Sequence, residues 1–131
     1  MPHPNQTSTA ALAVLIILQA VMLGALYAGV PPHPPTATPL FGIAPFLGAS
    51  MGAAVAAMLL GGGSSRTGRA LCLLAALMAL VSFGPQKYLD GQFGLIWPAV
   101  IFAQLACLAL FANAFRHARS GTATGRREDQ A

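Results

Sequence analysis

Four apolar runs, separated by segments rich in polar residues, glycine or proline, make up most of the chain. They cover residues 9–30, 40–60, 70–89 and 93–115. A helix needs about 20 residues, at ~1.5 Å per residue, to cross the hydrocarbon core of a bilayer, and each run offers roughly that number. The pattern therefore predicts an all-α membrane protein, folded as an up-down bundle of four transmembrane helices.

Capping and breaking residues set the expected limits of the first helix. Ser8 or Thr9 is available as its N-cap, and Gly29 precedes two prolines and provides the stop. Residues 31–39 then contain five prolines in nine positions, which excludes a helix and favours a stiff, extended connection. We interpret this connection as a spacer; the alternative is a loop that lies over the mouth of the bundle.

The third and fourth helices meet at a segment that concentrates the unusual residues. The third run offers only about 15 residues before Gly84, too few to span, so its helix is expected to continue past Pro85, with a kink, to Leu89. The turn is then expected at residues 91–94. Pro98 either occupies the first turn of the fourth helix or kinks a helix that begins earlier.

Composition and charge agree with a membrane protein and narrow its partners. Of 131 residues, 56% are hydrophobic and 8% are charged, against about 25% charged in soluble domains. The net charge is +4, but the arginines lie in residues 61–69 and 116–131, without interleaved aromatic residues, so nucleic-acid binding is not expected. Residues 116–131 contain few apolar side chains and are predicted to form a disordered basic tail in the cytoplasm.

The distribution of positive charge predicts the orientation. The connection at residues 61–69 holds two Lys or Arg residues and the tail holds four, whereas the opposite side holds one, Lys87. Positive residues concentrate on the cytoplasmic side of membrane proteins. Both termini are therefore expected in the cytoplasm of a bacterial cell, with the bundle in the inner (plasma) membrane and the lipid bilayer as its surroundings.

Small residues predict where helices pack. Gly48, Gly52 and Ala56 recur every four residues and form one ridge of the second helix. Such a ridge allows another backbone to approach closely in lipid, where there is no hydrophobic drive between helices. We expect the ridge to face a neighbouring helix of the same chain; the alternative is a second copy.

Two glutamines, Gln19 and Gln104, fall at about the same depth in the first and fourth helices. An unpaired amide in hydrocarbon costs several kcal/mol, so both are expected to face the interior. We predict a hydrogen bond between them that sets the register of the two helices. The alternative is a polar site for a ligand at mid-depth.

Lys87 and Asp90 are three residues apart and would share one face of a continued helix, where they could form an ion pair at the outer interface. Tyr88 and Trp97 lie nearby. One interpretation is an aromatic belt with a snorkelling lysine. The other is a candidate ligand site for a lipid headgroup or a quinone, formed by Lys87, Tyr88, Asp90 and Trp97, with Gln19 and Gln104 below.

Reactive groups give little support for catalysis. Cys72 and Cys107 lie inside apolar runs at different depths and are expected to be buried and unpaired. The three histidines fall on different segments, so neither a metal site nor a catalytic residue is predicted, and no cofactor is expected. The leading hypothesis is a non-enzymatic accessory or interaction subunit, with a membrane-protein partner or in a homo-oligomer. The alternative is a small transporter or a protein that binds a lipophilic ligand.

Overall fold

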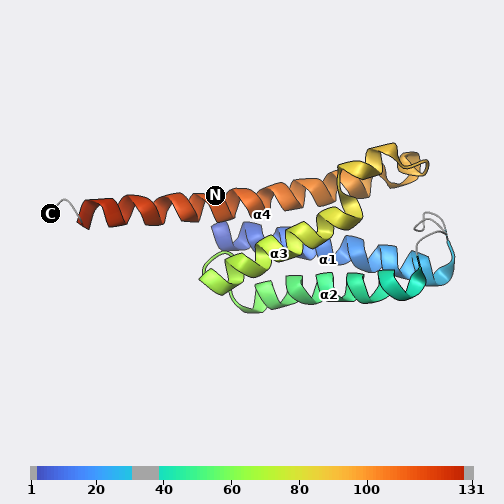
Figure 1. The fold of residues 1–131 in the computed structure, drawn as a ribbon, viewed down its shortest axis with the longest axis horizontal. Helices are drawn as coiled ribbons and strands as arrows, with labels where there is room; N and C mark the ends of the chain where they lie inside the picture. The colour runs from blue at the N-terminus through green and yellow to red at the C-terminus, as the bar shows by residue number, and fades with distance from the viewer. Residues whose placement is uncertain (1–2, 31–38, 129–131) are drawn as a thin grey trace.

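The computed structural model describes residues 3–30 and 39–128. Within these ranges the elements of secondary structure are all helices, with no strand. It forms α1 (Pro4–Ala28), α2 (Leu40–Leu59), α3 (Arg66–Phe83), the 3₁₀ helix η1 (Pro85–Leu89) and α4 (Phe93–Glu128). Each helix packs against the next, and α1 also packs against α4, so that α1 and α3 lie on a diagonal (Figure 1). The predicted all-α fold is confirmed; the proline-rich connection at residues 31–38 lies outside the described residues.

Four helices in the described ranges are long and apolar enough to cross a membrane: α1, α2, α4, and α3 taken together with η1. Their outward faces carry large apolar side chains, and Ile17, Phe41 and Leu108 are each at least 60% exposed. Contiguous apolar surface of this kind is unusual for a soluble monomer and typical of a surface that meets lipid or a partner.

The interior is built largely from small side chains. Alanines from all four α-helices and cysteines from α3 and α4 fill it, with a few leucines between them. Small residues let helix backbones approach closely, which increases van der Waals contact along the whole helix. Cys72 and Cys107 are both buried and free, as predicted, and the Cys107 thiol donates to the carbonyl oxygen of Ala76 at 3.5 Å.

The first helix begins earlier than its sequence suggested. Pro4 occupies the first position, where its missing N–H is not needed, and the backbone N–H of His3 donates to Gln6 Oε1 at 3.3 Å. Ser8, expected as an N-cap, instead lies inside the helix and is buried against α4. The predicted stop is correct, because Gly29 takes the left-handed conformation with φ 64°.

The end of α3 follows the predicted kinked path. The α-helix stops at Phe83 and η1 continues to Leu89. Pro85 has no N–H, and the side-chain amide of Gln86 replaces the lost donors by bonding to the carbonyl oxygens of Leu80 and Val81 at 3.1 and 2.8 Å. The turn that follows falls at residues 90–92, slightly before the expected position.

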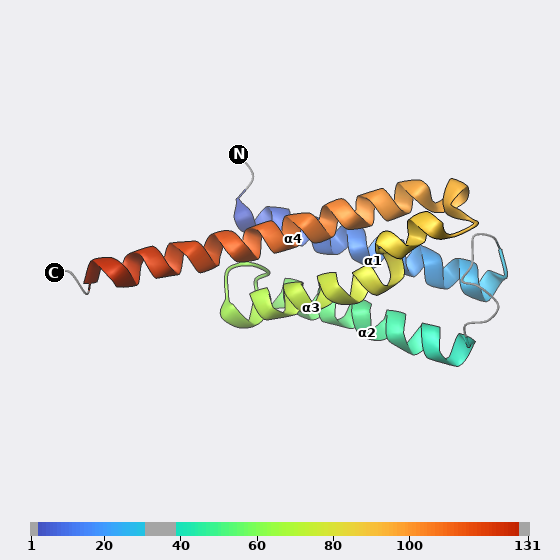
Figure 2. The same ribbon diagram turned by 45° about the horizontal axis from the view of Figure 1, so that its top comes forward.

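The last helix begins where predicted but is longer than predicted. It begins at Phe93, so Pro98 lies inside the helix. It also continues beyond Phe115 to Glu128, past the ends of the other helices, where residues 116–131 were expected to be disordered (Figure 2). A helix that is already nucleated can extend cheaply through residues that tolerate helix, and this segment contains no proline. Residues 129–131 lie outside the described ranges.

Candidate functional site

The η1 end of the molecule carries the predicted charge pair. Lys87 Nζ lies 3.1 Å from Asp90 Oδ2, and both side chains are about four-fifths buried, at 21% and 20% exposure. Asp90 Oδ1 also accepts the backbone N–H of Gln92 at 2.9 Å. This backbone hydrogen bond, and then the bond from Lys87, lower the pKa of the Asp90 carboxyl below its ordinary value. The hydrogen bonds of the Asp90 carboxylate fix the turn between η1 and α4.

Gln104 ties η1 and the end of α3 to α4. The Tyr88 hydroxyl donates to Gln104 Oε1 at 2.8 Å, and Gln104 Nε2 donates to the carbonyl oxygen of Phe83 at 3.1 Å. That carbonyl is free because α3 ends there. The Tyr88 ring also lies 5.1 Å from the ring of Phe93, whereas Trp97 is half exposed.

The predicted bond between Gln19 and Gln104 is therefore wrong. Gln19 faces α2 instead, where its Nε2 donates to the Ser50 hydroxyl at 2.8 Å. Each glutamine finds a closer partner than the other glutamine: a hydroxyl on α2 for one, and a hydroxyl and a free carbonyl near η1 for the other. Gln19 is 1% exposed, and its Oε1 has no hydrogen-bond partner among the described residues.

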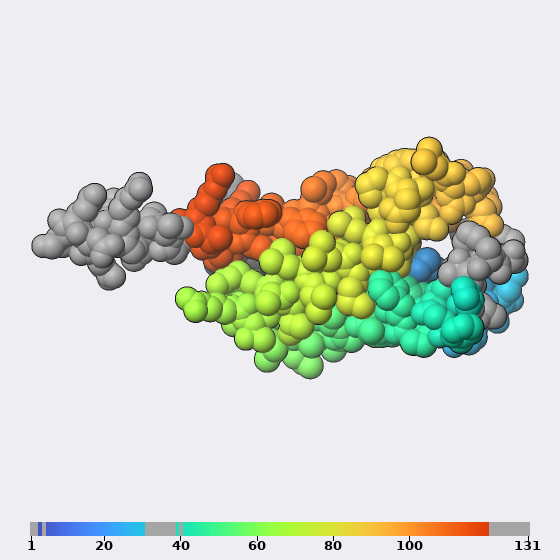
Figure 3. All heavy atoms as spheres, viewed as in Figure 1, coloured from blue at the N-terminus to red at the C-terminus, as the bar shows by residue number. Residues whose placement is uncertain are grey.

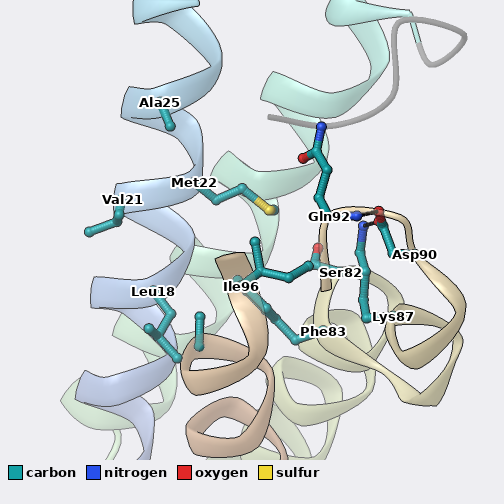
Figure 4. Close-up of a pocket in the computed structure, with 11 residues that line it drawn as sticks. Leu18, Val21, Met22, Ala25, Ser82, Phe83, Lys87, Asp90, Gln92 and Ile96 are labelled. Carbon is teal, nitrogen blue, oxygen red and sulfur yellow. Dashed lines mark hydrogen bonds and ion pairs between the residues drawn. The ribbon is translucent and has the colours of Figure 1, made fainter. Parts of the chain in front are cut away.

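A cavity of about 110 Å³ lies between α1, α3 and α4 next to the charge pair (Figure 4). Of the predicted ligand residues, Lys87 and Asp90 line it; Tyr88, Trp97, Gln19 and Gln104 do not. The remaining lining residues were not predicted and are mostly apolar: Leu18, Val21, Met22, Ala25, Ser82, Phe83, Gln92, Ile96 and Ala99.

The cavity follows from the early end of α3. α3 stops at Phe83, and η1 then turns toward α4 (Figures 1 and 2). Because η1 packs against α3 and α4 but not against α1, a space is left beside α1 at this end. The space-filling view shows a hollow between η1 and α2 in the same region (Figure 3). Gly84 and Pro85 were the sequence signal for this break, but the pattern did not indicate which neighbours would be left apart.

One unpartnered polar group faces the cavity. Ser82, on the last turn of α3, is 8% exposed, and its hydroxyl makes no hydrogen bond within the described residues. Its oxygen points into the space between Ile96 and Lys87 (Figure 4). The amide of the Gln92 side chain is also without a hydrogen bond there.

The small-residue ridge of α2 lies on the outside of the molecule, contrary to prediction. Gly48 and Gly52 are exposed, Ala56 is half-buried, and a Cβ added to either glycine would meet no atom within 4 Å. The opposite face of α2 packs inward through Leu47, Ser50, Ala54 and Ala57. Ser50 fixes this choice by bonding to Gln19, because a residue two positions away lies about 200° around the helix.

Within the described residues, no group of three His, Cys, Asp or Glu side chains is placed to hold a metal ion. No protein-family model, curated protein or solved structure matches this chain. The fold therefore defines the class of the protein: an all-helical chain that has, within the described residues, four helices long and apolar enough to cross a membrane.

Proposed function

We propose that this chain is a non-enzymatic interaction subunit of the bacterial inner membrane, and that α2 of one copy binds α2 of a second copy. In this proposal the four helices span the bilayer as an up-down bundle with both termini in the cytoplasm. The observation that carries the proposal is the exposed ridge of Gly48 and Gly52, against which none of the described residues packs.

The shape of the outer face of α2 suits a helix partner. Phe41 and Leu59, at opposite ends of the helix, are 83% and 81% exposed, and the two glycines lie between them. Large side chains at the ends and bare backbone in the middle form a waist in which another helix can lie. In lipid, such close contact is the main source of helix association.

A second copy is the partner that matches this face. Two copies inserted in the same direction present the same ridge to each other across a two-fold axis along the membrane normal, and small-xxx-small motifs pair in this way. Residues 40–60 carry no charged side chain, so the surface requires no opposite charge from its partner.

The test compares leucine substitutions at three glycines of α2. Gly48→Leu and Gly52→Leu would fill the waist, whereas Gly42→Leu adds the same bulk in the first turn of the helix. None of the three glycines has an atom within 4 Å of an added Cβ, so all three variants should fold. Fluorescence energy transfer between labelled full-length copies in bilayers should show association of the wild-type and Gly42→Leu proteins. For the other two variants we expect an apparent Kd at least about tenfold weaker, which corresponds to about 1.4 kcal/mol.

Three other outcomes are informative. The wild-type protein could stay monomeric but bind another membrane protein through the same two glycines. The partner would then be that protein and not a second copy, and the interaction function would stand. Wild-type protein that binds neither would overturn the proposal. Equal loss in the Gly42→Leu protein would show that bulk anywhere on α2, and not the ridge, controls association.

The alternative function of a small transporter has less support. A path across the bundle would need an opening from Lys87 to Gln104, and Gln104 is engaged by Tyr88 and the Phe83 carbonyl and does not line the cavity. Binding of a lipophilic ligand has more support than transport, because the cavity is lined mostly by apolar side chains.

A further inference from the structure

The cavity between α1, α3 and α4 is a feature that association through α2 leaves unused. None of the described residues that line it belongs to α2. Its volume is about 110 Å³, which is smaller than the apolar cavity of about 150 Å³ that holds a benzene ring. The cavity therefore has room for part of a ring or a short length of hydrocarbon chain, and the rest of a longer molecule would extend out of it.

The walls and the rim of the cavity differ in chemistry. Leu18 and Met22 of α1 face Phe83 and Ile96 across the space, so the walls are hydrocarbon, aromatic ring and thioether (Figure 4). Polar groups gather on the side of η1 and the following turn. This division suits a molecule with an apolar body and one polar end.

Ser82 supplies an unmet hydrogen bond at the boundary between these two zones. The residue is 8% exposed, and its hydroxyl makes no hydrogen bond with the described residues. A hydroxyl can both donate and accept a hydrogen bond. An oxygen atom of a bound molecule would satisfy it without any movement of α3.

The charge pair defines the polar end further. Lys87 uses one of its three N–H groups on Asp90, and the pair is neutral as a whole. A carbonyl or hydroxyl oxygen can accept from the remaining N–H groups, whereas a carboxylate head would lie against the carboxylate of Asp90. The geometry therefore favours an uncharged head.

We propose that this cavity binds an uncharged lipophilic molecule with a carbonyl or hydroxyl head, of the quinone or long-chain alcohol kind. Ser82 and Lys87 bind the head, and the hydrocarbon body lies along Leu18, Met22 and Ile96. The site is independent of the proposed association, because Gly48 and Gly52 lie on the outer face of a helix that does not line the cavity.

The binding test uses the full chain in mild detergent and four probes: a benzoquinone with a ten-carbon tail, decanol, decanoate and decane. A ligand that binds the folded state raises the midpoint of thermal unfolding, and the rise saturates with concentration. Trp97, the single tryptophan, follows the cavity residue Ile96 in α4 and provides a second readout by fluorescence quenching. We expect saturable binding of the quinone, the alcohol or both, and at least about tenfold weaker binding of decanoate and decane.

Three variants locate the site. Ala99→Leu extends a side chain into the cavity, and Ala112→Leu makes the same change at an exposed position of the same helix. Ser82→Ala keeps the packing and removes the hydroxyl. We expect Ala99→Leu to abolish saturable binding, Ala112→Leu to leave it unchanged, and Ser82→Ala to weaken it about fivefold, in line with the loss of one hydrogen bond.

Several outcomes would overturn this inference. Equal binding of decane and decanol would contradict a role for the polar head. Tighter binding of decanoate than of decanol would contradict the preference for an uncharged head. The cavity is also excluded as the site if neither probe with an uncharged head binds, or if Ser82→Ala and Ala99→Leu bind as the wild type does. None of these results affects the glycine variants of α2, so the two proposals fail separately.

Discussion

The two ends of the helix bundle differ in how closely the helices pack. At the loop end, formed by residues 60–69 with the adjoining parts of α1 and α4, the chain is packed so closely that glycine is required. A Cβ on Gly68 would meet the carbonyl oxygens of Gly62 and Leu60, and one on Gly63 would lie 3.2 Å from the Ser8 hydroxyl. At the η1 end, a Cβ on Gly84 would also meet the carbonyl oxygen of Leu80, but Gly91 and Gly94 have no atom within 4 Å of an added Cβ, and a cavity separates the helices.

Polar groups show the same contrast. At the loop end, Asn113 Nδ2 donates to the buried Ser8 hydroxyl at 3.2 Å, and Ser65 caps α3 by accepting the N–H of Gly68 at 2.9 Å. At the η1 end, the hydroxyl of Ser82 has no hydrogen-bond partner among the described residues. We infer that the loop end stabilises the fold, and that the η1 end leaves space and hydrogen-bonding capacity for a ligand.

The largest expected effect is at Gly68. Replacing it with alanine would place a methyl group against two backbone oxygens, of Gly62 and Leu60, which cannot move without opening the loop. Overpacking of this kind typically costs about 1–3 kcal/mol. We expect Gly68→Ala to lower the free energy of unfolding by about 2 kcal/mol, measured by thermal or denaturant unfolding in detergent.

The control for Gly68 is Gly24→Ala in α1, where an added Cβ meets nothing within 4 Å. Alanine is the better helix former, so this variant should gain about 0.5–1 kcal/mol. If Gly68→Ala were as stable as wild type, the loop end would not be tightly packed and the contrast between the ends would be lost.

A smaller effect should separate two buried serines. Ser8→Ala removes the acceptor of the bond from Asn113, whereas Ser82→Ala removes a hydroxyl without a partner among the described residues. Both changes are Ser to Ala inside a helix, so the gain in helix propensity cancels between them. We expect Ser8→Ala to be less stable than Ser82→Ala by about 1 kcal/mol, the typical net value of one hydrogen bond.

The ligand-free protein is the right sample for this pair of variants, since a bound molecule would add its own stabilisation. Equal stability of the two variants would mean that the bond between Ser8 and Asn113 contributes nothing measurable. A less stable Ser82→Ala would contradict the view that the η1 end carries unmet hydrogen-bonding capacity.

Much of the fold was predictable, because length and hydropathy set helix number and approximate limits. The end of α1 at Gly29 and the break at Gly84 and Pro85 follow from backbone chemistry that each residue carries alone. The start of α1 was missed because the sequence offers two suitable starts: Pro4 as the first helical residue, or Ser8 as an N-cap. The choice depended on Asn113, 105 positions away, which bonds to Ser8.

The candidate site was less predictable, because depth along a helix does not determine which face a side chain occupies. Gln19 and Gln104 lie at similar depths, yet one bonds to α2 and the other to η1 and the end of α3. The inward position of Ser50 likewise turned Gly48 and Gly52 outward. The ion pair of Lys87 and Asp90 was predicted correctly because the two residues are only three positions apart in the chain.

The smallest expected effect is at the rim of the cavity. Asp90→Asn removes an ion pair that is partly exposed to solvent, and pairs of this kind contribute about 0.2–1 kcal/mol. Because the folded state lowers the pKa of Asp90 below 3.8, the contribution is present at neutral pH and is lost as the pH falls below 3.8 through the folded-state value. The stability difference between wild type and Asp90→Asn should therefore shrink over that range. If Asp90→Asn lowered the free energy of unfolding as much as is expected for Gly68→Ala, the η1 end would contribute to the stability of the fold as much as the loop end does.

Lys87→Met separates the two causes of that lowered pKa. The backbone N–H of Gln92 is the largest single cause, and Lys87 contributes both a hydrogen bond and its charge, so the variant retains the largest single cause. We expect the difference in stability between Asp90 and asparagine at this position to remain dependent on pH in the Lys87→Met protein, measured by unfolding at a series of pH values between about 2 and 6. Complete loss of the pH dependence would mean that Lys87, and not the turn, holds the carboxylate. The rim would then depend on a side chain that the proposed ligand also needs, and binding would change the conformation of the η1 end.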